Sequence, residues 1–307
     1  MRLAPDQMKQ MIAEVTAKGD AANGERVFRR TDLSCYQCHS IAGAGGWLAP
    51  DLSSIGATAQ LDYLINSVLD PNKDIKDGYN GYTVVTRSGD VFSGIKVRQD
   101  SSNLVLRDNA HLEITIPLAD IKAQKEAGSL MPNGLADFLT HQELLDLIKF
   151  LSELGKPGAY GPSTAQYIRR WRVIDPVPQE LTSASPSSEQ FASLVDHRDW
   201  PPAYSLVSGY LPIDSILAKD KSLGYVRGEI DVTAPGKIRL QLNDAQGVAL
   251  WVEDQPVPVS AAEIPLELER GVHTLTFRVE GRHPEGLRVE VADVPGLSAH
   301  AQPVGGK

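Results

Sequence analysis

The stretch SCYQCHSIAGAGGWLAPDL, residues 34–52, contains both cysteines of this 307-residue chain. Cys35 and Cys38 lie three positions apart, and His39 directly follows the second cysteine. A pair with this spacing can form a disulfide, a redox dithiol, half of a zinc site or the attachment point of a haem. Each use requires different surroundings in the sequence, so the rest of the chain decides between them.

The surroundings favour haem attachment. A thiolate zinc site would need a second ligand pair, and the sequence has no further cysteine to provide it. A redox dithiol of the thioredoxin type follows a strand, whereas residues 24–33, GERVFRRTDL, predict a helix and then a loop. A disulfide across two residues would stabilise little, because its effect grows with the length of the closed loop. The C-x-x-C-H run therefore predicts that Cys35 and Cys38 form thioethers to one haem, with His39 as an iron ligand.

Composition and charge exclude several classes of protein. Hydrophobic residues make up 42% and charged residues 22%, as in soluble globular proteins, and the length suits more than one domain. The formal net charge of -9 argues against nucleic acid as a partner. No apolar run reaches the roughly 18 residues of a membrane-spanning helix, and residues 1–20 lack the apolar core of a signal peptide. Because such haem motifs are loaded outside the cytoplasm, we expect a periplasmic or otherwise exported protein whose precursor carries an export signal.

The start of the chain carries a family resemblance. GDAANGERVFRR, residues 19–30, together with the cysteine motif resembles the opening of a class I c-type cytochrome. The resemblance implies that Gly24 and Phe28 lie where the first cytochrome helix crosses the last. It also implies that Pro50 offers its carbonyl oxygen to the ring of His39, which would orient the imidazole.

The residues after the motif depart slightly from the family pattern. Many members have Gly-Pro-Asp-Leu where this chain has Ala49-Pro50-Asp51-Leu52. The proline is retained, and the resemblance implies that Pro50 and Leu52 lie at the haem.

The sixth iron ligand is expected to be Met131. It lies in GSLMPNGLADF, residues 128–138, and a Met-Pro pair in a loop before the last helix resembles the distal ligand of the family. His111 and His141 are the rivals for this position, and a methionine that only fills the core is the plainer alternative. A His/Met pair would leave no open coordination position, which suits electron transfer better than oxygen or peroxide chemistry.

Three amphipathic helices are predicted around these motifs. Residues 1–19 and 58–70 carry apolar side chains at helical spacing. Thr140 and Glu143 form a capping box ahead of a third helix, which ends near Gly155. The first of these helices could pack on the haem domain or pair with a second copy in a homodimer.

An insertion separates the histidine from the methionine. Residues 82–97 and 103–118 each read as two strands around a turn, which predicts a small antiparallel sheet at about residues 79–118. A cytochrome with such an insert and a closing Ser-Leu-Met-Pro resembles the haem-binding domain described in planctomycetes and verrucomicrobia. The resemblance covers roughly residues 18–155.

The sequence leaves two roles open for the inserted sheet. It could cover one haem edge and shape a docking face, or it could be a stability patch away from the haem. Trp47, Tyr79 and Tyr82 are candidates to donate hydrogen bonds to the haem propionates.

The rest of the chain reads as a linker and an all-β domain. Residues 156–202 are rich in proline and serine and predict a linker or extended wrap, and residues 203–307 alternate as in a β-sandwich or jelly roll. The latter segment resembles the PA14-type sandwich of carbohydrate-binding and adhesive modules. Where that family often has paired aspartates, this chain has Asn243-Asp244 and then Gln246. A structural or docking sandwich and a glycan binder are the two interpretations.

The predicted fold class is multidomain α+β. It consists of an N-terminal helix at 1–19, an α-helical cytochrome c domain at 20–155 with its small antiparallel sheet, a linker at 156–202 and an all-β sandwich at 203–307.

The predicted function is electron transfer by one covalently attached haem c with His/Met ligation. A dehydrogenase partner or fused domain would supply the electrons and a respiratory acceptor would receive them. The chain itself is then an electron carrier rather than an enzyme, although it could be a fragment of a larger dehydrogenase. Two alternatives remain. One is a haem peroxidase or gas sensor with a displaceable sixth ligand. The other is a glycan-binding or adhesive module in which haem is accessory.

Overall fold

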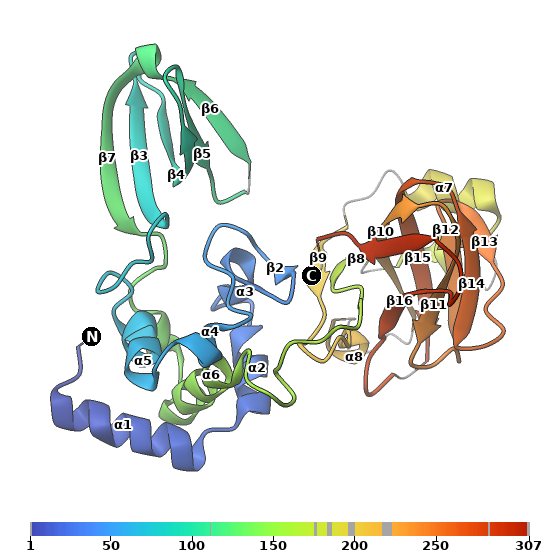
Figure 1. Cartoon of the computed structure of the whole chain (residues 1–307), viewed down its shortest axis with the longest axis horizontal. Helices are drawn as coiled ribbons and strands as arrows, with labels where there is room; N and C mark the ends of the chain where they lie inside the picture. The colour runs from blue at the N-terminus through green and yellow to red at the C-terminus, as the bar shows by residue number, and fades with distance from the viewer. Residues whose placement is uncertain are drawn as a thin grey trace. The chain divides into compact units, whose positions relative to one another are not determined.

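The chain folds into two compact units. The computed structural model describes residues 2–110, 112–174, 177–182, 186–195, 200–216, 223–281 and 283–305. The first unit comprises Met1–Ile41 and Gly45–Pro162, and the second comprises Ala42–Ala44 and Ser163–Lys307 (Figure 1). Each unit is considered by itself below.

Six α-helices belong to the described part of the first unit. They are α1 (Pro5–Lys18), α2 (Ala21–Phe28), α3 (Cys35–Cys38), α4 (Ile55–Thr58), α5 (Leu61–Leu69) and α6 (His141–Glu153). The predicted helices at 1–19 and 58–70 correspond to α1 and α5. The predicted capping box is confirmed at α6, where Thr140 N–H donates to Glu143 Oε2 at 2.8 Å and Glu143 N–H donates to Thr140 Oγ1 at 3.2 Å.

Helix α2 crosses α6 at very short distance. Gly24 makes this possible, because a Cβ built there would lie 2.0 Å from the carbonyl oxygen of Asp146. The Phe28 and Phe150 rings, from the same two helices, have centroids 5.8 Å apart. Gly24 and Phe28 therefore lie at a helix crossing, the placement that the family resemblance implies.

A five-stranded antiparallel sheet follows α5. Its strands are β3 (Asn80–Thr86), β4 (Val91–Gln99), β5 (Asn103–Arg107), β6 (Glu113–Pro117) and β7 (Ile121–Ser129), in the spatial order β6-β5-β4-β3-β7 (Figure 1). The 3₁₀ turn η1 (Leu118–Asp120) returns the chain so that β7 pairs with β3. Four side chains that are at most 3% exposed form a core on one face: Val84, Leu104, Leu106 and Ile116. The sheet thus has a hydrophobic core of its own.

The sequence underestimates this sheet. The predicted segment of about 79–118 ends before β7, whose side chains are mostly exposed and lack the alternation of a half-buried strand. Leu112, just before β6, is 63% exposed.

The predicted fold class is therefore wrong. In the part of the chain that the structure describes, strands outweigh helices (36% against 24%), so no predominantly helical cytochrome domain is evident there. The first unit is a mixed unit. It combines its helices with the five-stranded sheet. A separate two-stranded sheet pairs β1 (Ser40–Ile41) with β2 (Ala44–Gly45). The error has a physical cause. The helices can be predicted from their caps and apolar faces, whereas β7 is exposed and has no apolar alternation by which to predict it.

The second unit contains two antiparallel sheets. One has the order β13-β12-β15-β10-β8-β9, with β17 also on β10, and the other has the order β14-β11-β16. The strands are β8 (Arg170–Ile174), β9 (Pro202–Tyr204), β10 (Leu223–Ala234), β11 (Gly236–Leu242), β12 (Val248–Val252), β13 (Gln255–Val257), β14 (Glu263–Leu268), β15 (Gly271–Glu280), β16 (Val289–Asp293) and β17 (His300–Pro303). Ile238 and Leu240 of the smaller sheet and Phe277 of the larger one are fully buried in one core. This is the packing of a β-sandwich.

The predicted linker contributes to this sandwich. Strand β8 lies within residues 156–202, and β9 begins at the last residue of this range. Both strands extend the larger sheet, and Trp171 of β8 is 2% exposed. Short helix α7 (Ser188–Val195) also falls in this range, and Phe191 stacks on Trp251 of β12 with ring centroids 4.6 Å apart. Buried aromatic side chains therefore make much of this proline-rich segment part of the second unit. Helix α8 (Ile213–Ile216) and the 3₁₀ turn η3 (Gln179–Leu181) complete the elements described there.

The loop at Asn243 and Asp244 is held by internal hydrogen bonds. The Asn243 side chain donates to the carbonyl oxygen of Gly286 at 3.1 Å and accepts from Arg288 N–H at 2.7 Å. The Asp244 carboxylate accepts from Gln246 N–H at 2.9 Å. These bonds give both side chains a structural role in the turn.

Candidate functional site

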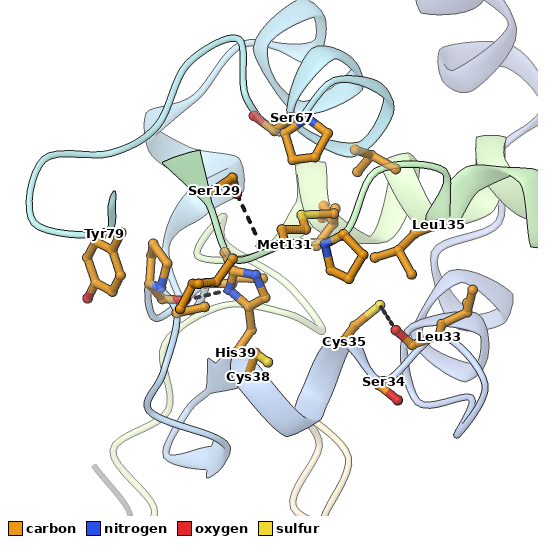
Figure 2. A pocket seen from close by; sticks show the side chains of 18 of the residues that line it. Leu33, Ser34, Cys35, Cys38, His39, Ser67, Tyr79, Ser129, Met131 and Leu135 are labelled. Carbon is orange, nitrogen blue, oxygen red and sulfur yellow. Dashed lines mark hydrogen bonds between the residues drawn. The ribbon is translucent and has the colours of Figure 1, made fainter. Parts of the chain in front are cut away.

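A cavity of about 530 Å³ lies in the first unit. Residues from α3, α5, α6, β4 and the loop after β7 line it, and Cys35, Cys38, His39 and Met131 are among them. Figure 2 shows these four side chains with part of the surrounding wall. The motif that the sequence singles out and the distant methionine thus lie at one cavity.

A backbone carbonyl orients the ring of His39. His39 Nδ1 lies 2.7 Å from the carbonyl oxygen of Pro50, the contact that the family resemblance implies (Figure 2). Because a carbonyl oxygen only accepts, Nδ1 carries the proton and Nε2 keeps a free lone pair. Burial lowers the pKa of His39, while the bond to Pro50 acts in the opposite direction. The imidazole is therefore held in the neutral form that a metal ion requires.

The neighbouring turn reinforces this arrangement. Ser40 Oγ donates to the Asp51 carboxylate at 2.6 Å, and Leu52 N–H donates to the carbonyl oxygen of Ser40 at 2.8 Å. The two residues after Pro50 are thereby tied to the residue that follows His39.

The two cysteine side chains lie on a single helical turn and are not joined to each other by a disulfide. Ser34, with a φ of 55°, is the residue just before α3, and Cys35 Sγ lies 3.9 Å from the carbonyl oxygen of Leu33. Burial raises the pKa of Cys35 to about 11 and also raises that of Cys38. Reactive dithiols have a lowered pKa instead, so this environment disfavours a redox dithiol. Among the residues that the structure describes, no group of three or more His, Cys, Asp or Glu side chains could hold a metal ion.

Met131 also lines the cavity, although it lies far from the cysteine motif in the sequence. It follows β7, and its N–H donates to Ser129 Oγ at 3.1 Å (Figure 2). Of its two rivals, His141 lies at the start of α6 with Nε2 2.8 Å from Glu14 Oε2, and it is not among the described residues that line the cavity. His111 lies outside the described residues.

The remaining predicted site residues divide into two groups. Pro50, Leu52 and Tyr79 line the cavity. Trp47 and Tyr82 are absent from its wall within the part of the chain that the structure describes.

Each of these two aromatic residues outside the cavity wall has contacts elsewhere. Trp47 is 50% exposed, and its carbonyl oxygen accepts from Arg107 Nη1 at 3.1 Å. Tyr82 lies in β3, where its hydroxyl donates to Glu126 Oε1 at 2.7 Å and Lys96 Nζ lies 5.0 Å from its ring centroid. The sheet interaction of Tyr82 is not visible in the sequence, because β7 is not predicted.

Sequence reasoning missed most of the apolar wall. These side chains come from α4, α5, α6, the sheet and the segment from the methionine loop to α6: Ile55, Leu64, Val68, Ile95, Leu130, Leu135, Leu139, Leu147 and Leu151. The apolar faces of α5 and α6 are predicted, but a face that lines a cavity has the same spacing as one that packs in a core.

The comparisons with known proteins assign no family. No protein-family model matches the chain, and no curated protein matches it. Among solved structures, a selenomethionine-labelled β-glucosidase from Kluyveromyces marxianus is 12% identical, with a TM-score of 0.25. That match covers 42% of this chain and 14% of the β-glucosidase, so the chain spans a small part of that protein.

Within the described residues, none of the helices has the length and apolar character needed to cross a membrane.

Proposed function

We propose that the first unit is an electron carrier with one haem c, attached through Cys35 and Cys38 and ligated by His39 and Met131. The observation that carries this proposal is the shared cavity, to which the C-x-x-C-H motif and a methionine from a distant segment both contribute. Haem supplies a one-electron Fe(II)/Fe(III) couple when bound.

The cavity suits a large, mostly apolar group. Its volume of about 530 Å³ lies within the range of roughly 300–1,000 Å³ for ligand and cofactor sites. Leucine, isoleucine and valine side chains form much of the wall, while the two thiols are contributed by one turn of helix. This combination of an apolar wall and paired thiols fits a tetrapyrrole bound at one edge.

The donor set suits iron that cycles between two oxidation states. His39 offers a neutral Nε2, because Nδ1 donates to Pro50. Met131 offers a soft thioether, which favours Fe(II) and raises the reduction potential relative to a second imidazole. If both residues ligated the iron, no coordination position would remain open for oxygen or peroxide, which favours electron transfer over the peroxidase or gas-sensor alternative.

The protein would contribute positioning and exclusion of water. The Pro50 carbonyl holds the imidazole in one orientation, and the apolar side chains of α5 and α6 keep bulk water away from the ligand pair. A dry surrounding disfavours the more highly charged oxidised state, which is a second influence toward a higher potential.

The wider role follows from this chemistry as part of the same proposal. An exported carrier of this type would receive electrons from a dehydrogenase partner or fused domain and pass them to a respiratory acceptor. The sandwich of the second unit would serve as a structural or docking module, with glycan binding as its alternative.

The first test is covalent loading. The full chain is produced in a host with cytochrome c maturation, and mass spectrometry of denatured protein should show the mass of one retained haem. Cys35→Ala/Cys38→Ala should abolish this retention completely, whereas Gln37→Ala, between the cysteines, should preserve it. Free thiols in the wild-type protein would refute the proposal.

The second test concerns the sixth ligand. Ferric wild-type protein should be low-spin and show the weak charge-transfer band of a methionine–iron bond, and Met131→Ala should lose that band. Met8→Ala, on α1, is the matched control and should retain it. High-spin ferric protein that binds cyanide at once would favour the enzyme or sensor alternative. Glycan-array binding by the full chain, unaffected by Met131→Ala, would favour the adhesive alternative.

A further inference from the structure

The loop that carries Met131 is short and bends sharply at both ends. Gly128 before it and Gly134 after it have φ angles of 80° and 83°, which favour glycine. Leu130 packs on β3, since a Cβ built on Gly81 would lie 2.8 Å from Leu130 Cδ2. These contacts hold the base of the loop, but only the Ser129 hydroxyl contacts the backbone of Met131 by a hydrogen bond among the described residues.

Asn72 links this loop to the turn that follows α5. Its Oδ1 accepts from Ser129 N–H at 2.9 Å, and its Nδ2 donates to Asn133 Oδ1 at 3.3 Å. One side chain therefore bonds to the residue two positions before Met131 and to the residue two positions after it. Gly128 permits the approach, because a Cβ there would lie 2.6 Å from Asn72 Oδ1.

The two bonds form a bridge across the base of the methionine loop. A chain of contacts leads from Asn72 to Ser129 N–H, and from Ser129 Oγ to Met131 N–H. The turn that carries Asn72 begins at Pro71, which itself lines the cavity. The position of Met131 is thus coupled to the cavity wall by side chains as well as by the paired end of β7.

We propose that Asn72 is a positioning residue that holds Met131 at the iron site and limits its displacement by outside ligands. The proposal rests on the proposed ligation by Met131, which Asn72 does not itself provide. Without the bridge, the loop keeps its glycine turns but loses the bonds that fix their separation. Met131 then yields more readily to a competing ligand.

The test uses the loaded full chain and imidazole as the competing ligand. Asn72→Ala should tighten apparent imidazole binding to ferric protein about threefold to tenfold, the effect of one to two exposed hydrogen bonds. Asn72→Asp keeps an acceptor for Ser129 N–H and loses the donor to Asn133, so its effect should be smaller. Asn103→Ala, in β5 and outside the described cavity wall, should bind imidazole as the wild type does.

Amide hydrogen exchange provides a readout that does not require haem. Exchange at Ser129 and Met131 should accelerate about threefold to tenfold in Asn72→Ala. Ser129→Ala is the second variant, useful if Asn72→Ala fails to fold. It should accelerate exchange at the Met131 N–H and leave the backbone N–H of position 129 protected by its bond to Asn72.

The outcomes separate the two proposals. Imidazole affinity and exchange within twofold of wild type in Asn72→Ala would overturn the role of Asn72. Absence of covalent haem in wild-type protein would instead refute the proposed function. In that case, the exchange rates at positions 129 and 131 still decide whether Asn72 holds the loop.

Discussion

His39 and Met131 line the same cavity, but different kinds of group hold them. His39 is oriented by the backbone carbonyl of Pro50, eleven positions further along the chain. Met131 is held through two side chains, Ser129 and Asn72, and Asn72 lies 57 positions from Ser129. The support of His39 is therefore local in sequence and made with the main chain, whereas the support of Met131 is long-range and made with side chains. Below, these are called the proximal side (His39 and Pro50) and the distal side (Met131, Ser129 and Asn72).

This difference predicts how each side responds to substitution. A backbone carbonyl survives most changes of side chain, so the His39 side should tolerate mutation at its hydrogen-bond partner. The Met131 side should not, since one substitution removes the bonding group itself. Both sides also depend on the crossing of α2, which precedes the cysteine motif, with α6, which follows the methionine loop.

The largest effect is expected at that crossing. Gly24→Ala would place a Cβ 2.0 Å from the carbonyl oxygen of Asp146, and a backbone atom cannot rotate away. We expect a loss of about 3 kcal/mol in the free energy of unfolding of the first unit, measured by urea denaturation. Arg26→Ala, on the exposed side of α2, should cost far less. If Gly24→Ala were as stable as Arg26→Ala, the crossing would not support the two sides of the cavity.

The next effect concerns the buried carboxylate at the same crossing. Asp146 is 1% exposed, and it accepts from Asn23 Nδ2 at 2.6 Å, from Asp20 N–H at 2.8 Å and from Gln142 Nε2 at 2.8 Å. Burial raises the pKa of Asp146, but these hydrogen bonds together lower it below its ordinary value. Its contribution to stability is therefore fully present above about pH 4, the pKa of an aspartate in the unfolded chain. It is lost as the pH falls through the lower pKa of the folded state.

Asp146→Asn tests this contribution directly. It should cost about 2 kcal/mol at neutral pH, because the amide replaces one acceptor with a donor facing other donors. The variant should also lose less stability than wild type between pH 5 and about pH 2, as measured by thermal unfolding. Asp77→Asn, an exposed loop residue, should keep the acid sensitivity of the wild type. Parallel pH curves for wild type and Asp146→Asn would contradict the assignment.

A smaller effect should separate the distal side from the proximal one. Gly128→Ala and Gly78→Ala both place alanine at positive φ, at 80° and 84°, so both share the same backbone cost. Only Gly128 has Asn72 Oδ1 within reach of the new Cβ, at 2.6 Å, whereas Gly78 has nothing within 4 Å. Asn72 would rotate away and release Ser129. Gly128→Ala should therefore be about 1 kcal/mol less stable than Gly78→Ala, measured by denaturation. Equal stability would show that the approach of Asn72 to Gly128 is energetically neutral.

The same contrast explains what could be predicted from sequence. The contact of His39 with Pro50 is implied by a short motif, and the cap of α6 by Thr140 and Glu143, because both involve neighbours in the chain. Asn72 carries no motif, and its partners lie far away in sequence. Exposed β7 gives no alternation, so the sheet was underestimated and the fold class was wrong. Residues near a motif are thus predictable, while residues that a long-range pairing brings to it are not.

The smallest effect is expected at Pro50. Pro50→Ala retains the carbonyl oxygen that accepts from His39 Nδ1, so the imidazole should keep its orientation. The cost should be below about 1 kcal/mol, mainly from the greater freedom of the unfolded chain. In loaded protein, the imidazole affinity should stay within twofold of wild type, in contrast to Asn72→Ala. A change at Pro50 as large as that at Asn72 would mean that the proline ring, rather than its carbonyl, holds the proximal side, and the contrast between main-chain and side-chain support would fail.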